Sequence, residues 1–304
     1  MKVFLNKINE SWIVDRVRNE WIELNGDLAT SSIRNADIIW ILSPWLWQKV
    51  SKKRLGQKKV LCSQYHFDFE NYDFDDFYTL DKYVDEYHVI SKKTEEQLRT
   101  LTDKKITSIP FWINQNIFYE IKNKKQLRKE FGFSENDYFV GSFQRDTEGH
   151  DLLSPKLIKG PDRFFEIVKE IYKNNKNMKV ILTGKRRGYL INKFKESDIP
   201  YVYFEMASFV DLNKLYNLLD LYVVSSRIEG GPQAILECGI TKTPIVSTDV
   251  GVSSEILAGE SIFETKNFTK AKPNVDYAYK NSLEFAIPEG IEKFNLMLRN
   301  LFES

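Results

Sequence analysis

The spacing of apolar residues from Tyr138 onward predicts repeated strand-helix units. Short apolar runs rich in β-branched residues indicate buried strands, whereas apolar residues three or four positions apart indicate helices. Strands are expected at residues 138–143, 179–183, 201–204, 221–226 and 244–248, and helices at 160–175, 189–196 and 211–219, the last capped by Asp211. Such units imply a parallel sheet covered by helices on both faces.

The first third of the chain alternates in a similar way. Strands are expected at residues 2–5, 37–42, 59–61, 86–90 and 106–109, and helices at 12–24 and 95–100, with Ser91 as an N-cap. Pro110 and the charged run at 122–129 indicate a linker and the first helix of a second domain. We therefore expect a short first domain at 1–110, a second at 111–285 and a C-terminal helix at 286–304 that packs back toward the first.

Composition narrows the class of protein. A chain of 304 residues is long enough for two α/β domains, and its net charge of +1 gives no general reason to expect a nucleic-acid partner. Cys62 and Cys238 form neither a metal-binding pattern nor a disulfide framework, which favours a reducing compartment. The sequence shows no secretion signal and no apolar run approaching ~20 residues, so a cytoplasmic location is expected.

The segment that ends at Glu237 carries the most specific chemistry. It reads as a strand, a glycine loop and a helix start, in which Gly230 and Gly231 leave no side chain between the backbone and a ligand. Pro232 suits a first helical position, and the free N–H groups of that turn favour a phosphate or an electron-rich hydroxyl. Glu229 and Glu237 flank this anion site, which points to a phosphorylated sugar as ligand.

Several further segments occur in the order of one known family. They are Val89-Ile90-Ser91, residues 109–114 with Phe118, Gly141 followed by Lys159-Gly160-Pro161-Asp162, the two glutamates with seven residues between them, Pro244-Ile245-Val246, and Val250-Gly251 with Glu255. With these motifs, residues 84–257 resemble retaining, nucleotide-sugar-dependent glycosyltransferases of the GT-B fold, the family 4-like group also called glycosyl transferases group 1.

The resemblance implies a fold and a reaction. The fold would be α/β, with two facing Rossmann-like domains and a cleft between them. The enzyme would move a hexose-type sugar from a UDP- or GDP-sugar to a glycan, lipid-linked or small-molecule acceptor, with retention at the anomeric carbon. It would need no metal ion or other cofactor, and the sequence has no aspartate-x-aspartate motif.

The resemblance also implies a role for each site residue. Glu229 would bind the donor sugar, and Glu237 would accept both ribose hydroxyls. The diphosphate would be neutralised by Lys159 and Arg145, and His66 of the first domain would face the donor sugar. Backbone contacts to the sugar and diphosphate would come from Gly230, Gly231, Pro232 and Gln233.

The basic half of the diphosphate site departs from the family. Ser142 and Phe143 stand where the family has an arginine, and an insertion at 146–157 separates Arg145 from Lys159. Lys156 therefore competes with Arg145 for this role. The run at 185–187 follows a strand and could meet the nucleotide, although a solvated turn is the favoured interpretation.

Other interpretations stay open at this stage. A nucleotide-sugar epimerase or hydrolase shares this fold, and a non-catalytic nucleotide-sugar-binding protein would share its motifs. Trp45 and Trp47, with the lysines between 49 and 59, are also consistent with peripheral contact at the inner face of a membrane. The alternative is an ordinary helix with core tryptophans and a solvated basic face.

Overall fold

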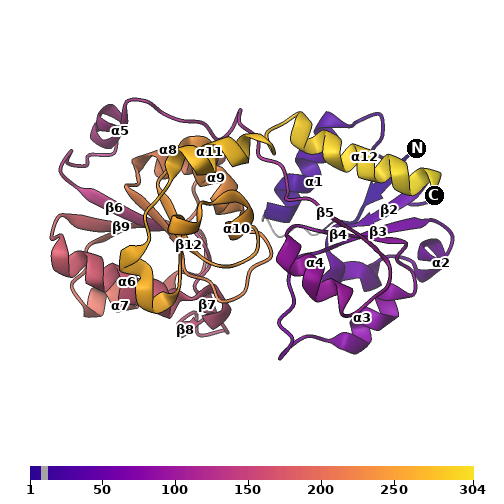
Figure 1. Cartoon of the computed structure of the whole chain (residues 1–304), viewed down its shortest axis with the longest axis horizontal. Helices are drawn as coiled ribbons and strands as arrows, with labels where there is room; N and C mark the ends of the chain where they lie inside the picture. The colour runs from indigo at the N-terminus through magenta and orange to yellow at the C-terminus, as the bar shows by residue number, and fades with distance from the viewer. Residues whose placement is uncertain (8–12) are drawn as a thin grey trace. The chain divides into compact units, whose positions relative to one another are not determined.

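The computed structural model describes residues 1–7 and 13–304 and divides into two compact units. Unit 1 comprises Met1–Trp112 and Phe285–Ser304, and unit 2 comprises Ile113–Glu284. Figure 1 shows a separate sheet in each unit. The expected start of the first helix, at residue 12, lies outside the described residues.

Unit 1 is built on a parallel five-stranded sheet. Its strands are β1 (Val3–Leu5), β2 (Ile38–Ile41), β3 (Lys59–Gln64), β4 (Glu86–Val89) and β5 (Lys105–Ser108), adjacent in this order. The connecting elements are α1 (Ile13–Leu24), the 3-10 helix η1 (Pro44–Lys49), α2 (Lys52–Leu55), α3 (Phe74–Asp81) and α4 (Lys92–Arg99). Ser91 caps α4 as expected, because its side chain accepts a hydrogen bond from the N–H of Thr94.

The C-terminal helix α12 (Glu289–Glu303) belongs to unit 1. In Figure 1 its yellow ribbon lies beside α1, although the two helices are far apart in the sequence. Phe294 of α12 is fully buried and stacks on Trp40 and Phe111, with ring centroids 5.7 and 5.8 Å apart. One hydrophobic core therefore joins the two ends of the chain.

Unit 2 is built on a parallel six-stranded sheet in the order β10-β9-β6-β11-β12-β13. The strands are β6 (Tyr138–Ser142), β9 (Met178–Thr183), β10 (Tyr201–Phe204), β11 (Leu221–Val224), β12 (Ile245–Thr248) and β13 (Ile262–Phe263). The α-helices are α5 (Lys124–Glu130), α6 (Pro161–Asn174), α7 (Gly188–Glu196), α8 (Phe209–Leu218), α9 (Gln233–Thr241), α10 (Ser253–Ile256) and α11 (Val275–Leu283). Three 3-10 helices complete the unit, η2 (Leu157–Lys159), η3 (Gly259–Ser261) and η4 (Thr265–Lys270).

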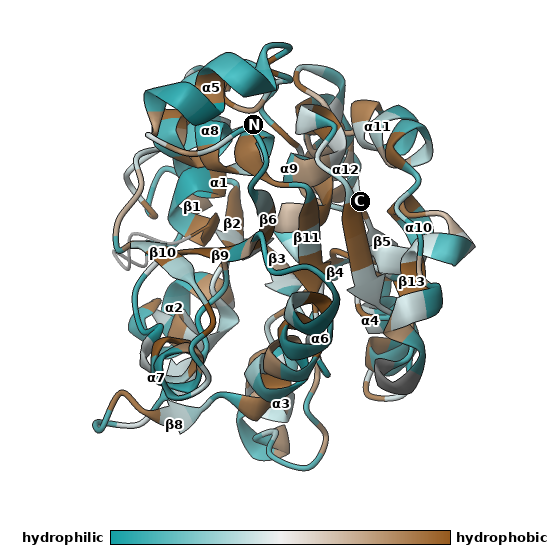
Figure 2. Cartoon of the chain, turned by 90° about the vertical axis from the view of Figure 1, so that its left-hand side faces the viewer, coloured by the Kyte–Doolittle hydropathy of each residue, from teal (hydrophilic) through white to brown (hydrophobic). Residues whose placement is uncertain are grey.

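Hydrophobic strands and amphipathic helices give both units the expected α/β class. In Figure 2 the central strand β11 is brown, whereas α5 shows a mostly hydrophilic surface. Strand order in unit 2 reverses between β6 and β11, because β9 and β10 extend one side and β12 and β13 the other. Ligands of such sheets bind beyond the carboxyl ends of the strands at this reversal, which directs attention to the loops after β6 and β11.

Several expected boundaries are wrong for identifiable reasons. β3 continues beyond Leu61 to Gln64, because the added residues pair with β4. α8 begins at Phe209 and is capped by Ser208 rather than Asp211, because the Ser208 side chain accepts the N–H of Asp211. The insertion at 146–157 forms an antiparallel hairpin of β7 (Thr147–Glu148) and β8 (Ser154–Pro155).

One of the two tryptophans expected to contact a membrane, Trp47, is buried. Trp47 is only 1% exposed, and its Nε1 donates to the Asp76 carboxylate at 3.0 Å, so this side chain cannot serve as an interfacial anchor. Trp45, in the same 3-10 helix, is 42% exposed. Among the described residues, no helix combines the length and the apolar character needed to cross a membrane.

Candidate functional site

The loop after β11 is shaped by hydrogen bonds to distant segments. The sequence predicts that β11 ends at Ser226, but the strand ends at Val224. Ser225 and Ser226 instead form hydrogen bonds with residues of other segments. Ser225 Oγ donates to the carbonyl of Gly160 at 2.8 Å, and Thr248 Oγ1 donates to the carbonyl of Ser226 at 2.7 Å. These bonds bring the segment before α6 and the end of β12 to the carboxyl end of β11.

Two glycines with positive φ permit this close approach. Gly160 has φ +63°, and a Cβ there would lie 1.9 Å from the carbonyl oxygen of Ser225. Gly251 has φ +50°, and a Cβ there would lie 2.2 Å from the carbonyl oxygen of Gly230. Both contacts are backbone contacts that no rotamer change can relieve, so the loop around Gly230 requires glycine at these positions.

Pro232 precedes α9 and is not its first helical residue. Its ψ of 110° is extended, which makes it the N-cap and places the start of α9 at Gln233. Gly230 is buried, whereas Gly231, Pro232 and Gln233 are half-buried. The backbone of these residues therefore forms the short turn that leads into the helix.

An ion pair joins the two sequence motifs at this loop. Lys159 Nζ lies 2.6 Å from Glu229 Oε1, and the two side chains are only 14% and 12% exposed. Ser226 Oγ lies 3.2 Å from Glu229 Oε1 and 3.2 Å from Gln144 Oε1. Gln144 Nε2 donates to the Lys159 carbonyl at 2.8 Å. Gln144 and Ser226 thus orient the pair.

Of the two candidates for the additional cation, Lys156 lies in the field of both Arg145 and Lys159. The pKa of half-buried Lys156 is lowered mainly by burial and then by the positive charges of Arg145 and Lys159. Arg145 is exposed, and its Nε donates to the Thr147 carbonyl at 2.7 Å. The insertion therefore carries Lys156 toward the expected diphosphate site instead of moving Arg145 away from it.

A second ion pair, between Arg227 and Asp162, fixes the position of the loop after β11. The two terminal nitrogens of Arg227 donate to the two carboxylate oxygens of Asp162 at 2.8 and 2.6 Å. The N–H groups of Arg227 and Ile228 both donate to the carbonyl of Ile158. Hydrogen bonding by Arg227 lowers the pKa of Asp162. Asp162, part of the family motif, thereby ties the start of α6 to the loop after β11.

Glu237 lies deeper than its neighbours in the sequence indicate. It is 5% exposed, because α9 packs against both α8 and α11. Its Oε2 accepts a hydrogen bond from Tyr216 Oη at 2.6 Å. Burial, and then the negative charge of Glu237, raises the pKa of Tyr216. Tyr216 fixes the orientation of this carboxylate, and no motif in the sequence marks it for that role.

A family comparison covers most of unit 2. Residues 138–272 match the model of a family described as Glycosyl transferases group 1. The chain is a glycosyltransferase, and the match to this family lies within unit 2. The match includes Lys159, Glu229 and Glu237, and it identifies the donor as a nucleotide-sugar. No curated protein matches the sequence.

Solved structures resemble this glycosyltransferase along nearly its whole length. HepE of Anabaena, in complex with UDP, is 13% identical, with 99% of this chain and 100% of that chain covered and a TM-score of 0.76. Sucrose-phosphate synthase from Thermosynechococcus elongatus is 13% identical, with 98% and 81% covered and a TM-score of 0.70. The pneumococcal O-GlcNAc transferase GtfA, in complex with UDP and GlcNAc, is 15% identical, with 95% and 60% covered and a TM-score of 0.66. These likenesses show the GT-B fold.

In the glycosyltransferase, the turn at 185–187 is not fully solvated. Arg187 is 1% exposed, and its Nε lies 3.0 Å from Asp146 Oδ2, while one terminal nitrogen donates to the Ser142 carbonyl at 2.8 Å. Burial raises the pKa of Asp146 to about 6, against the opposing effect of Arg187. The pair joins the loops after β6 and β9, so Arg187 has a structural role beside the site.

His66 lies two residues beyond β3 in unit 1. It is half-buried and stands where the sheet's carboxyl edge begins. Its assignment to the donor sugar stays a prediction. Among residues 1–7 and 13–304, no three His, Cys, Asp or Glu side chains are grouped in a way that could hold a metal ion.

Proposed function

We propose that this glycosyltransferase moves a hexose from a UDP-hexose to a glycan, lipid-linked or small-molecule acceptor, with retention and without a metal ion. The observation that carries the proposal is the Lys159–Glu229 pair at the loop after β11. The choice of UDP is supported by HepE, which has been solved with UDP and with UDP-glucose, and by GtfA, solved with UDP and GlcNAc.

Donor binding would exchange the partners of this ion pair. The diphosphate competes with Glu229 for the Lys159 ammonium, and Lys156 and Arg145 add positive charge nearby. Glu229 then becomes available to accept hydrogen bonds from sugar hydroxyls and to stabilise positive charge on the sugar as its bond to phosphate loosens. Cations already in place where charge develops are usually a large catalytic contribution.

The ribose is assigned to Glu237. A carboxylate can accept hydrogen bonds from both hydroxyls of a diol, and Tyr216 restricts the rotation of this one. The backbone N–H groups of Gly230, Gly231 and Gln233, before and at the start of α9, are assigned to the diphosphate and the sugar, while Pro232 has no N–H to donate. His66 is the contribution proposed for unit 1.

The bond changes need no protein base. The bond between the anomeric carbon and the β-phosphate oxygen breaks, and UDP leaves with its electron pair. The acceptor oxygen forms a new bond to the anomeric carbon from the face that UDP vacates, which retains the configuration. The acceptor proton passes to the departing phosphate oxygen, so charges and atoms balance.

A Glu229→Gln variant tests the proposal. Slow hydrolysis of UDP-glucose without acceptor should fall by at least about 100-fold, because the charge that stabilises the loosening sugar is removed. UDP affinity measured by calorimetry should stay the same or rise, because in this variant UDP binding does not require the Lys159–Glu229 ion pair to break. Glu166→Gln, on the exposed face of α6, is the matched control and should behave as the wild type.

The same assay distinguishes the remaining alternatives. Conversion of the UDP-sugar to its epimer would show that the protein is an epimerase and not a transferase. UDP binding without turnover would indicate a binding protein. Near-normal hydrolysis by folded Glu229→Gln would refute the assigned role. Hydrolysis should continue in excess EDTA, and its loss there would contradict metal independence.

A further inference from the structure

Trp45 is an exposed indole just beyond the carboxyl end of β2 in unit 1. It lies in η1, four residues after the end of β2, and is 42% exposed, whereas Trp21, Trp40 and Trp112 are each at most 1% exposed. Exposing so large an apolar ring is costly unless a ligand covers it. The position therefore calls for a functional explanation.

The indole rests on a rigid base. Its ring centroid lies 5.7 Å from that of Tyr65, which in turn lies 6.0 Å from that of Phe111 in the core. Tyr65 Oη donates to the carbonyl of Leu42 at 2.7 Å, and Thr94 Oγ1 donates to the carbonyl of Tyr65 at 2.8 Å. Hydrogen bonds therefore hold both the hydroxyl group and the backbone carbonyl of Tyr65 in place, and the ring of Tyr65 packs against the ring of Trp45.

The backbone that leads to Trp45 is fixed as well. Asn6 Oδ1 accepts the N–H groups of Leu42 and Ser43 at 2.9 and 3.1 Å, and Asn6 Nδ2 donates to the Ser43 carbonyl at 3.0 Å. Asn6 is 5% exposed, so these bonds are shielded from water. A ring held in this way loses little conformational entropy when a ligand covers it.

Trp45 and His66 follow neighbouring strands at the same edge of the sheet. β2 and β3 are paired in parallel, with Ile41 opposite Cys62, and the two residues come after the carboxyl ends of these strands. Parallel α/β sheets bind ligands beyond this edge. The edge of unit 1 thus presents an aromatic face from one strand and a polar ring from the next.

We propose that Trp45 is a saccharide-binding subsite that stacks on the apolar face of a pyranose of the acceptor. This inference rests on the proposed function and narrows the acceptor to a molecule with a pyranose ring at this position. A flat indole matches the row of C–H groups on one face of a pyranose, and it leaves the hydroxyls of the ring edge available to polar neighbours.

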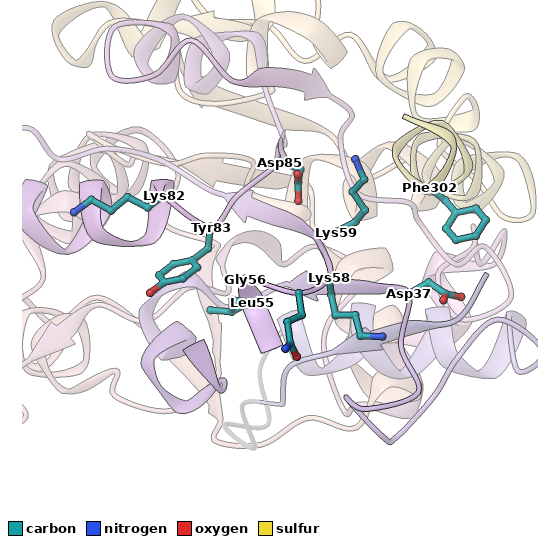
Figure 3. A pocket seen from close by; sticks show the side chains of 10 residues that line it. Asp37, Leu55, Gly56, Lys58, Lys59, Lys82, Tyr83, Asp85 and Phe302 are labelled. Atoms are coloured by element: carbon teal, nitrogen blue, oxygen red, sulfur yellow. The ribbon is translucent and has the colours of Figure 1, made fainter. Parts of the chain in front are cut away.

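Two of the lysines between 49 and 59, Lys58 and Lys59, lie away from Trp45, which favours a saccharide over a membrane. Lys58 and Lys59 line a hollow of about 580 Å³ together with Asp37 and Asp85. Lys59 is the first residue of β3, and the other three residues come just before a strand. Figure 3 shows these residues around the hollow at the amino edge of the sheet. A strand the length of β3 spans roughly 20 Å, so these lysines and Trp45 lie at opposite edges and do not share one membrane-facing surface.

Saturation-transfer NMR of the full chain with UDP tests the subsite. The probes are the methyl β-glycosides of glucose, galactose and N-acetylglucosamine, each at millimolar concentration. We expect ring protons of at least one probe to receive saturation from the wild type. Trp45→Ala should weaken its binding about tenfold, whereas Trp45→Phe should retain most of it because a stacking ring remains. Tyr78→Ala, which removes a ring 47% exposed on α3, is the matched control and should bind as the wild type.

Three results would overturn the subsite. They are the absence of saturation transfer to all three probes with the wild type, equal transfer with Trp45→Ala, and Trp45-dependent sedimentation with phosphatidylglycerol-containing vesicles without any saccharide signal. The last would assign the ring to a membrane. Hydrolysis of UDP-glucose by the wild type decides the proposed function separately, so failure of the transferase assignment and failure of the subsite can be distinguished.

Discussion

At the residue scale, the site depends on close contacts between backbone atoms, which a change of side-chain rotamer cannot relieve. Gly160 shows this most directly, because it combines a positive φ with a 1.9 Å approach of its virtual Cβ to the Ser225 carbonyl. The residues on either side of this contact carry the chemistry, since Lys159 precedes Gly160 and Ser226 follows Ser225. A methyl group at this position would therefore disturb both stability and the Lys159–Glu229 pair.

We predict that Gly160→Ala lowers the free energy of unfolding by about 3 kcal/mol, from left-handed backbone strain plus the clash. It should also reduce UDP-glucose hydrolysis. Gly132→Ala is the matched control, because Gly132 has φ +71° but no atom within 4 Å of its virtual Cβ, so only the strain of about 1 kcal/mol applies. Thermal or urea denaturation followed by circular dichroism measures both. Equal costs for the two variants would contradict the close-contact argument.

At the element scale, neighbouring strands are joined through a buried chain of side chains. Trp40 Nε1 on β2 donates to Ser63 Oγ on β3 at 2.9 Å, and Ser63 Oγ lies 2.9 Å from His88 Nδ1 on β4. His88 Nε2 lies 2.8 Å from the carbonyl of Ile109 and must donate to it, which leaves Nδ1 to accept from Ser63. This arrangement requires a neutral imidazole.

Burial accordingly lowers the pKa of His88 to about 4, below the value near 6.5 expected in the unfolded chain. Between these values the unfolded chain binds a proton that the folded chain does not. The free energy of unfolding should thus fall by roughly 3 kcal/mol as pH drops from 6.5 to 4. Urea denaturation of the wild type and His88→Gln measures this, since the wild-type advantage should shrink over that range. A difference independent of pH would show that His88 does not cause it.

The sequence predicts these elements well where the signal is local. The alternation of apolar runs and helical spacing predicts the parallel strands, and the glutamate motif identifies the loop after β11. The end of β11 is missed, because Ser225 bonds to Gly160, which lies 65 positions away. The hairpin β7–β8 has strands of only two residues, too short for a periodic pattern. Gln144 and Tyr216 are polar residues without a motif, so only the fold reveals their contacts.

At the scale of the whole molecule, the chain begins and ends in the same unit, and the family match lies in the other. All six tryptophans precede Ile113 in the sequence, so tryptophan fluorescence reports on unit 1. The proposed nucleotide contacts of Lys159, Glu229 and Glu237 all belong to unit 2. Stability of unit 1 and affinity for UDP can consequently be measured in one sample.

Phe294→Ala should separate the two properties. Phe294 is fully buried against Trp40, Phe111 and Trp112, so its truncation should destabilise unit 1 by about 3–5 kcal/mol, seen as a lower urea midpoint of tryptophan fluorescence. Phe302→Ala, on the same helix but 46% exposed, should change the midpoint little. UDP affinity, measured by calorimetry without urea, should stay within about twofold of the wild type for both variants, a change of at most about 0.4 kcal/mol. A parallel loss of UDP affinity in folded Phe294→Ala would mean that nucleotide binding depends on the core of unit 1.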